Sequence, residues 1–221
     1  MIVKLCGMRR VEDMEAVNRA RPDYAGTICS PGFKRSVTME TAERLRAALD
    51  PEIPLVGVFV NEEMDRIRSF LESGIIQAVQ LHGTEDAAYL ERLRLVTDAP
   101  IFQAFQIKQK IDLTAAMESP ADRILLDSGT GSGETLDWSL LTGMARPFLL
   151  AGGLTPENVT AALQQVHPAG VDVSSGIETD GWKDAEKMAR FVAACRSWEE
   201  TRCAIRMAAS ASTAGSISRR P

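Results

Sequence analysis

The sequence predicts a single closed (β/α)₈ barrel, the TIM-barrel fold. Short apolar, β-branched segments alternate eight times with longer amphipathic segments, and strict alternation of this kind gives parallel strands. A chain of 221 residues accommodates one such barrel at the lower end of its size range, with little room for a second domain. An open doubly wound sheet is the alternative, but no early G-x-G-x-x-G follows the first strand, which weakens its dinucleotide-binding form.

The expected strands are rich in Val, Ile, Leu and Phe, and the expected helices repeat apolar residues every three to four positions. The strands cover residues 2–6, 23–29, 54–60, 76–81, 100–106, 122–127, 147–151 and 170–174. The helices cover residues 11–20, 39–49, 62–73, 85–96, 137–144, 156–165 and 183–196. Two helix starts carry signals of their own, Thr38 before Glu40 and Pro156 after Thr155. The interval 108–118 is short, so we expect a short or irregular fifth helix there.

We expect the barrel domain to occupy residues 1–197 and a C-terminal tail to occupy 198–221. The composition changes near residue 198, and residues 208–221 are small and polar with no apolar periodicity. Such a segment buries too little apolar surface to fold by itself, and chain ends are loosely held unless they dock. The tail is therefore expected to be disordered.

Composition limits the classes of partner. The net charge of −5 argues against a nucleic-acid-binding protein, and no apolar run is long enough to cross a membrane. The four cysteines show no C-x-x-C pairing and the opening apolar stretch is too short for a signal peptide, so we expect a cytoplasmic protein with reduced thiols. Two histidines without an H-E-x-x-H pattern predict no metal site.

The first strand ends in Lys4-Leu5-Cys6-Gly7, at the barrel face where TIM-barrel active sites lie. Because side chains alternate along a strand, Lys4 and Cys6 share the face opposite Leu5, and Leu5 suits packing under the helices. A free cysteine is usually a small core residue. A thiolate at this position can, however, abstract a carbon-bound proton if a nearby cation lowers its pKa. We therefore take Cys6 as the candidate general base.

The sixth strand ends in Asp127, and a glycine-rich segment follows it at 128–133. A carboxyl group at the top of a strand is a candidate general acid, although Asp-Ser-Gly is also common turn chemistry. Gly131 and Gly133 in this segment are candidate substrate-binding residues. The segment lacks the lysine of a nucleotide-binding P-loop.

Small residues follow both the seventh and the eighth strand. Gly153 ends the first of these segments, and Ser174, Ser175 and Gly176 end the second. Exposed backbone N–H groups, hydroxyls and the start of a short helix are how barrels bind a phosphate dianion at this position. A phosphorylated small molecule is therefore the expected ligand.

Two further residues follow the second and fourth strands. The guanidinium of Arg35 can bind a carboxylate through two hydrogen bonds. His82 can either polarise a substrate or cap the next helix, and the sequence favours neither.

Together these residues resemble the phosphoribosylanthranilate isomerases of tryptophan biosynthesis. The matching strings span residues 2 to about 195, in order and at barrel spacing. They are Lys-Leu-Cys-Gly (4–7), Val-Gly-Val-Phe-Val-Asn (56–61), Val-Gln-Leu-His-Gly (79–83), Leu-Asp-Trp-Ser (136–139), Ala-Gly-Gly-Leu-Thr-Pro-Glu-Asn-Val (151–159) and Val-Asp-Val-Ser-Ser-Gly-Ile-Glu (171–178).

The resemblance implies an Amadori rearrangement without a cofactor, from N-(5′-phosphoribosyl)anthranilate to 1-(2-carboxyphenylamino)-1-deoxyribulose 5-phosphate. Asp127 would protonate the furanose oxygen, Cys6 would remove the C2′ proton, and Arg35 would hold the anthranilate carboxylate. The residues at 153 and 174–176 would hold the phosphate. One departure is Phe33-Lys34-Arg35, where the family often has Ser-Pro-Arg or Ser-Lys-Arg.

We expect Lys4 and Asp172 to pair inside the barrel; the alternative is that Lys4 pairs elsewhere or reaches solvent. The eighth strand neighbours the first in a closed barrel, and strand phase turns both charges inward, where neither is tolerable alone. The Lys4 ammonium would then favour the Cys6 thiolate, and Asp172 would offset part of that effect. Asp172 also joins the expected substrate-binding set.

Two other functions stay open. One is a different phosphate-binding barrel enzyme, such as the histidine-pathway aminoaldose isomerase or a sugar-phosphate epimerase. Cys6 argues against the former, which typically has Asp at that position, and two histidines supply too few metal ligands for the latter. The other is a non-catalytic sugar-phosphate binding protein. We expect a monomer or a homodimer.

Overall fold

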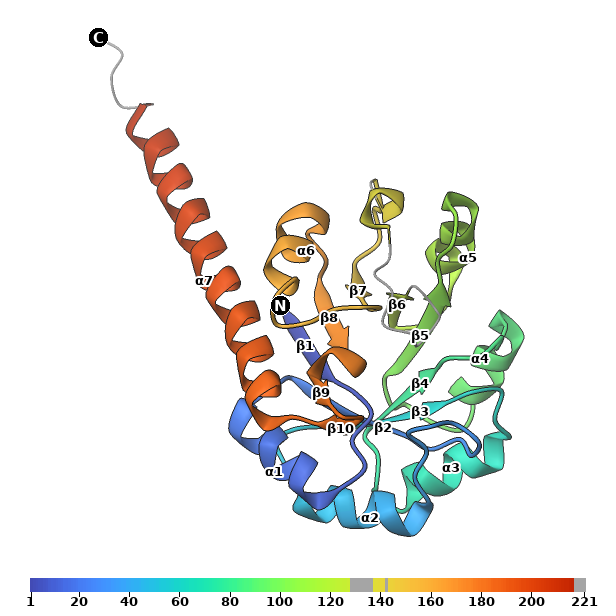
Figure 1. Ribbon diagram of the computed structural model, residues 1–221. Helices are drawn as coiled ribbons and strands as arrows, with labels where there is room; N and C mark the ends of the chain where they lie inside the picture. The colour runs from blue at the N-terminus through green and yellow to red at the C-terminus, as the bar shows by residue number, and fades with distance from the viewer. Residues whose placement is uncertain (128–136, 142, 217–221) are drawn as a thin grey trace.

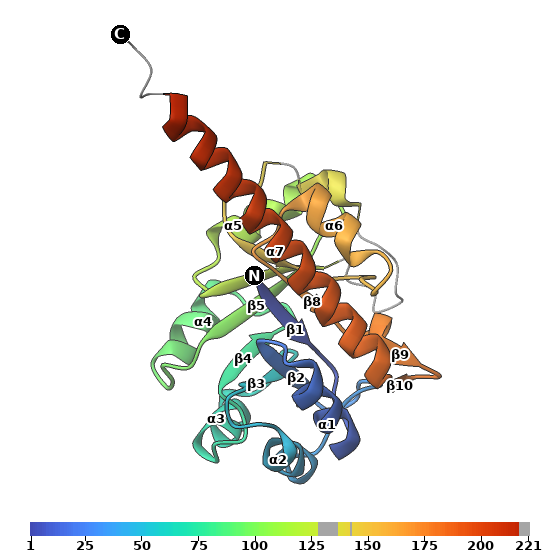
Figure 2. The same ribbon diagram turned by 90° about the vertical axis from the view of Figure 1, so that its left-hand side faces the viewer.

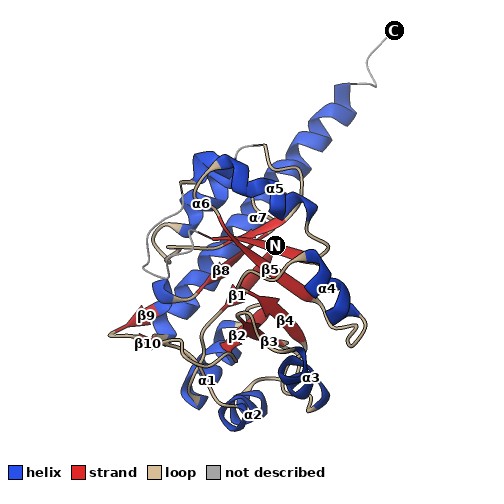
Figure 3. Cartoon of the chain, turned by 90° about the vertical axis from the view of Figure 1, so that its right-hand side faces the viewer, coloured by secondary structure: helices blue, strands red, loops and turns tan. Residues whose placement is uncertain are grey.

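Eight parallel strands close into a barrel in sequence order, and β8 pairs with β1 to complete it (Figures 1 and 3). The computed structural model describes residues 1–127, 137–141 and 143–216. Each strand lies within its predicted range, which confirms the (β/α)₈ fold. The strands are β1 (Ile2–Leu5), β2 (Tyr24–Ile28), β3 (Leu55–Phe59), β4 (Ala78–Leu81), β5 (Ile101–Gln106), β6 (Arg123–Asp127), β7 (Phe148–Leu150) and β8 (Gly170–Val173).

Helices surround the barrel on its outside (Figures 1 and 3). The α-helices are α1 (Val11–Ala20), α2 (Met39–Ala48), α3 (Met64–Glu72), α4 (Ala87–Arg94), α5 (Leu113–Glu118), α6 (Val159–Val166) and α7 (Ala185–Ser216). The 3₁₀ helices are η1 (Lys110–Asp112), η2 (Trp138–Leu141) and η3 (Ser175–Ile177). The interval between β5 and β6 holds only η1 and the short α5, as the sequence predicted. Thr38 caps α2 by accepting the backbone N–H of Thr41 at 3.1 Å.

Apart from the last helix, two predicted helices differ from the structure by more than small shifts at their ends. The helix expected from residue 156 begins at Val159, because the Thr155 hydroxyl and the Asn158 side chain make a local turn instead. Such side chains compete with the helical hydrogen bonds of their own backbone. The helix expected over 137–144 is, in the described residues, the 3₁₀ turn η2, and Gly143 follows it at φ +88°.

The predicted phase of the first and last strands is confirmed. Val3 and Leu5 of β1 pack in the core between strands and helices, as do Val171 and Val173 of β8. The side chain of Lys4 is turned to the barrel interior, where it lies opposite Asp172 in the register of the two strands. A second apolar cluster fills the interior below the site, formed by Val56, Ala78, Phe102, Ala104, Leu125 and Leu149. This layer closes the floor beneath the functional residues.

A small hairpin between β8 and α7 was not expected from the sequence. After η3, strands β9 (Glu178–Thr179) and β10 (Trp182–Lys183) pair antiparallel. Strands of two residues are too short to produce a recognisable alternation. The hairpin matters because it brings Glu178 and Lys183 to the barrel mouth.

The last helix is longer than predicted. Residues 185–216 form one continuous helix, so 198–216 are helical and no break in secondary structure marks residue 197. The first part of α7 packs on α1 and α6, and the remainder projects beyond the barrel (Figures 1 and 2). An existing helix extends without a new nucleation step, and the alanine-rich sequence favours extension. Within the described residues, no helix combines the length and apolarity needed to span a bilayer.

Candidate functional site

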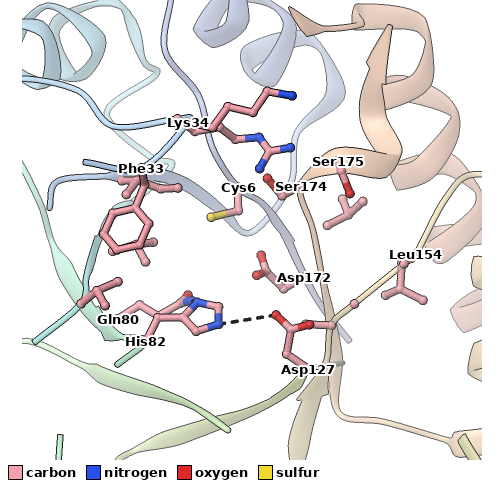
Figure 4. Close-up of a pocket in the computed structure, with 18 residues that line it drawn as sticks. Cys6, Phe33, Lys34, Gln80, His82, Asp127, Leu154, Asp172, Ser174 and Ser175 are labelled. Atoms are coloured by element: carbon pink, nitrogen blue, oxygen red, sulfur yellow. Dashed lines mark hydrogen bonds and ion pairs between the residues drawn. The ribbon is translucent and has the colours of Figure 1, made fainter. Parts of the chain in front are cut away.

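A cavity of about 490 Å³ opens at the C-terminal ends of the strands. The candidate residues Cys6, Arg35, His82, Asp127 and Gly153 line it. Asp172, Ser174 and Ser175 line it as well (Figure 4). Gly131 and Gly133 lie outside the described residues. The loops after strands spread along the whole chain therefore meet at one site, as the barrel topology requires.

Cys6 lies above a buried ion pair at the centre of this cavity. Lys4 is fully buried, and its ammonium donates a hydrogen bond to the Asp172 carboxylate at 2.9 Å, which confirms the predicted pair. Burial lowers the pKa of Lys4, but Asp172 and Cys6 outweigh that effect and hold it above its usual value. The Lys4 ammonium therefore stays charged next to Cys6.

Burial raises the pKa of the Cys6 thiol above its ordinary value. The positive charges of Lys4 and Lys183 lower it and the Asp172 carboxylate raises it, but burial is the largest of these effects. Lys4 therefore acts in the expected direction, but burial outweighs it and the net pKa of the Cys6 thiol is raised.

The wall beside Cys6 is a glycine with little spare space around it. A Cβ atom added to Gly26 of β2 would lie 3.0 Å from the Cys6 sulfur and 3.2 Å from the Lys4 Nζ. These distances are tighter than ordinary van der Waals contacts. Gly26 thus lets Lys4 and Cys6 pack directly against the neighbouring strand.

His82 and Asp127 lie next to each other on the side of the cavity opposite Cys6. The Nε2 atom of His82 lies 3.5 Å from Oδ2 of Asp127, and Nδ1 of His82 lies 3.3 Å from Nε2 of Gln80 (Figure 4). The next helix, α4, is capped by Asp86, which accepts the N–H of Tyr89 at 2.8 Å. Of the two predicted readings of His82, the structure therefore favours a place in the site over helix capping.

The loops after β7 and β8 form one surface. Gly152 and Gly153 both adopt positive φ, at 84° and 64°, a backbone conformation that favours glycine. A Cβ on Gly176 would lie 1.8 Å from the carbonyl oxygen of Leu154, so only glycine lets the two loops touch. The helical turn η3 begins at Ser175. This places the four predicted phosphate-binding residues on one patch, which we call the phosphate cradle: Gly153, Ser174, Ser175 and Gly176.

Arg35 lies at the mouth of the cavity in a buried ionic cluster that the sequence did not predict. Its Nε and Nη2 atoms donate to the two carboxylate oxygens of Glu178 at 2.7 and 2.9 Å. Lys183 donates to the same carboxylate at 2.9 Å and to the carbonyl oxygen of Ser174 at 2.7 Å. Despite partial desolvation, hydrogen bonds and charges from Arg35 and Lys183 lower the pKa of Glu178 to about 2. Glu178 is therefore ionised and holds both cations beside the cradle.

The sequence contained a partial signal for this cluster. Glu178 ends the last of the strings that carry the family resemblance, directly after the cradle. Lys183 carried no signal, because only the hairpin folds it back to Ser174. A charged residue near the end of a predicted barrel strand is the feature that points to such a group.

Comparison with known proteins identifies the family of the chain. The family model described as N-(5′-phosphoribosyl)anthranilate (PRA) isomerase matches residues 3–194. The chain is 42% identical over 200 residues to the N-(5′-phosphoribosyl)anthranilate isomerase of Endomicrobium trichonymphae, covering 88% of this chain and 98% of that protein.

Two solved structures share the fold over nearly their whole length. A phosphoribosyl anthranilate isomerase in complex with reduced 1-(o-carboxyphenylamino)-1-deoxyribulose 5-phosphate has a TM-score of 0.78 and 34% identity, covering 89% of this chain and 100% of that one. Monomers of the dimeric enzyme from Thermotoga maritima have a TM-score of 0.79 and 35% identity, with the same coverage. The chain belongs to the N-(5′-phosphoribosyl)anthranilate isomerase family.

Proposed function

We propose that this protein converts N-(5′-phosphoribosyl)anthranilate into 1-(2-carboxyphenylamino)-1-deoxyribulose 5-phosphate in tryptophan biosynthesis, with Cys6 as general base and Asp127 as general acid. The observation that carries the proposal is the placement of a thiol and a carboxyl group on opposite walls of one cavity, next to a phosphate cradle (Figure 4). An Amadori rearrangement requires one group that gives a proton and another that takes one.

The first step opens the sugar ring. Asp127 in its protonated form transfers its proton to the furanose oxygen, the C1′–O bond breaks, and the aryl nitrogen forms an iminium with C1′. His82, 3.5 Å from the Asp127 carboxylate, is placed to orient it. The phosphate, bound in the cradle, fixes the sugar between the two groups.

The second step removes the C2′ proton. The iminium formed in the first step brings a positive charge close to Cys6, and a nearby positive charge favours a thiolate. This positive charge counteracts the burial that raises the pKa of Cys6. The thiol releases its own proton to water, and the resulting thiolate accepts the C2′ proton. The electron pair of the C–H bond forms the C1′–C2′ double bond, the electron pair of the C1′=N bond returns to nitrogen, and the resulting enolamine tautomerises to the ketone.

Arg35 is our candidate for binding the anthranilate carboxylate. Glu178 takes up the Nε and Nη2 side of the guanidinium, so we infer that the carboxylate approaches from Nη1. The Glu178 contact then holds the guanidinium in one orientation before the substrate arrives, which reduces the ordering cost of binding. Asp172 acts on the site indirectly, because it binds the Lys4 ammonium and keeps it charged next to Cys6.

A side-by-side assay tests the function. Freshly prepared phosphoribosylanthranilate loses its fluorescence as it is consumed, and the histidine-pathway aminoaldose is followed in parallel under the same conditions. We expect turnover of the anthranilate compound with at most weak turnover of the other. Turnover of the histidine-pathway compound alone would refute the proposal, as would binding of both without turnover.

We further infer a cytoplasmic place of action, since a catalytic thiol needs a reducing compartment. A monomer or a homodimer is expected, because the Thermotoga maritima relative is described as dimeric and has been studied as monomers. Light scattering of the purified protein at assay concentration distinguishes the two.

A further inference from the structure

The cavity has two ends of different chemistry. One end is the phosphate cradle, with its backbone groups and hydroxyls. The other end is apolar and is lined by Ile28, Val58, Val60 and the ring of Phe33. Figure 4 shows Phe33 across the cavity from Ser175 and Leu154, with Cys6 and Asp127 between the two ends. A ligand held by its phosphate at one end and reacting in the middle therefore extends toward the apolar end.

Phe33 is an unusual residue to find at this place. Its side chain is 47% exposed although it is large and apolar. Exposed aromatic rings beside a cavity are typical of ligand-binding surfaces, because the ring gains by being covered. The three residues on each side of it, 30–32 and 34–36, are polar, small or charged, so the ring does not belong to a larger apolar surface segment of the chain.

The loop that carries Phe33 is held in a defined shape. Ser36 accepts the N–H of Phe33 on its hydroxyl oxygen at 2.9 Å, and its own N–H donates to the Phe33 carbonyl at 3.0 Å. The same hydroxyl donates to the carbonyl oxygen of Ser30 at 2.6 Å. Gly32, at φ +87°, makes the turn before the ring. Phe33 therefore meets a ligand with little loss of backbone freedom.

We propose that Phe33 is a specificity-determining residue that packs against the aryl ring of the substrate. This rests on the proposed function and adds the residue that selects an aryl amine. Arg35, two positions further along the same loop, faces the carboxylate on that ring, so one loop recognises both parts of the aryl group. Stacking of two aromatic rings adds a gain beyond the apolar area that they cover.

The same wall disfavours a polar amine substituent. An imidazole carboxamide, as carried by the histidine-pathway aminoaldose, would lose hydration against Val58, Val60 and Phe33, whose side chains have no hydrogen-bonding groups. Burying polar groups without partners is costly, and rejection of this kind discriminates strongly. Phe33 thus contributes to both the acceptance of one substrate and the exclusion of the other.

The test compares two ligands on four proteins: wild type, Phe33→Ala, Phe33→Tyr and Leu95→Ala. Leu95 is 86% exposed beyond the end of α4 and serves as the matched control for loss of an exposed apolar side chain. The ligands are reduced 1-(o-carboxyphenylamino)-1-deoxyribulose 5-phosphate, which carries the aryl ring, and ribose 5-phosphate, which does not. Equilibrium dissociation constants are measured for both, with KM and kcat for phosphoribosylanthranilate.

We expect Phe33→Ala to weaken the aryl ligand roughly 3- to 30-fold and to raise KM similarly, with kcat within about twofold and ribose 5-phosphate binding unchanged. Phe33→Tyr should restore aryl binding, and Leu95→Ala should change nothing. Unchanged aryl binding in Phe33→Ala, or equal weakening of both ligands, would overturn the role of Phe33. A wild-type protein that binds the aryl ligand through Phe33 but shows no turnover would instead contradict the proposed reaction.

Discussion

Replacing Lys4 by methionine tests how much the buried Lys4–Asp172 pair stabilises the protein and how the Lys4 charge changes the pKa of Cys6. Methionine keeps most of the length of lysine but has no charge, so the change leaves the Asp172 carboxylate without the ammonium that lies 2.9 Å away. The side chains of Lys4 and Asp172 are 0% and 9% exposed, so water replaces little of the lost interaction. Removing one partner of a buried ion pair costs about 3–5 kcal/mol. That is a large part of the about 5–15 kcal/mol that stabilises a domain.

Urea unfolding measures this cost, with the double variant Lys4→Met/Asp172→Leu as its partner. Removing both charges leaves no unpaired group, so the double variant should recover most of the lost free energy of unfolding. Arg190→Met is the control, because the Arg190–Glu157 pair has a similar distance of 2.8 Å but side chains that are 53% and 61% exposed. Arg190→Met should lower the free energy of unfolding by less than about 1 kcal/mol.

The same variant changes the thiol. The charge of Lys4 lowers the pKa of Cys6, so Lys4→Met should raise it further and slow alkylation at a given pH. The exposed Cys203 is first replaced by serine, and mass spectrometry of the alkylated peptides separates the reaction of Cys6 from that of the buried Cys29 and Cys195. A Lys4→Met protein as stable as Arg190→Met, or a double variant no more stable than the single one, would refute the buried-pair reasoning. An unchanged Cys6 pKa would refute the claim that the charge of Lys4 lowers it.

Three further predictions concern the mouth of the cavity. Gly176→Ala should weaken inorganic phosphate binding, measured by calorimetry, because its Cβ would lie 1.8 Å from the Leu154 carbonyl oxygen and force the two cradle loops apart; normal phosphate affinity would contradict the cradle. Arg35→Ala should weaken the anthranilate-bearing product analogue and leave phosphate binding near normal, whereas equal losses for both ligands would argue against its assignment. Glu178 has a lowered pKa of about 2, so its contribution to stability is present above the unfolded-state pKa near 4.5 and is lost as pH falls from there toward 2. Acid unfolding of Glu178→Gln should accordingly be less steep over that interval than for wild type, and an identical pH dependence would show that Glu178 does not make this contribution.

Strand phase and barrel topology made part of the site predictable. Two-residue alternation places Lys4 and Cys6 on one face of β1, and closure of the barrel brings β8 beside it, so the Lys4–Asp172 pair follows from the sequence. The small residues after β7 and β8 pointed to the cradle because the loops after neighbouring barrel strands lie side by side. These features depend on regular geometry, which a sequence pattern records well.

Other features depend on contacts that local patterns do not contain. Glu178 and Lys183 meet Arg35 and Ser174 only through the hairpin β9–β10. The direction of the Cys6 pKa depends on how deeply the thiol is buried against the charges around it, and that balance needs the packed structure. The length of α7 depends on helix extension from a docked first part, and residues 208–216, which are small and have no apolar periodicity, give no sign of it in the sequence.

The most direct test of the account is the kcat of Cys6→Ala and Asp127→Asn with phosphoribosylanthranilate as substrate, measured together with the affinity for inorganic phosphate. If the two groups on opposite walls are the base and the acid, each variant loses roughly 10²-fold or more in kcat while phosphate affinity stays near that of wild type. A variant with kcat within a fewfold of wild type would contradict the role given to that residue.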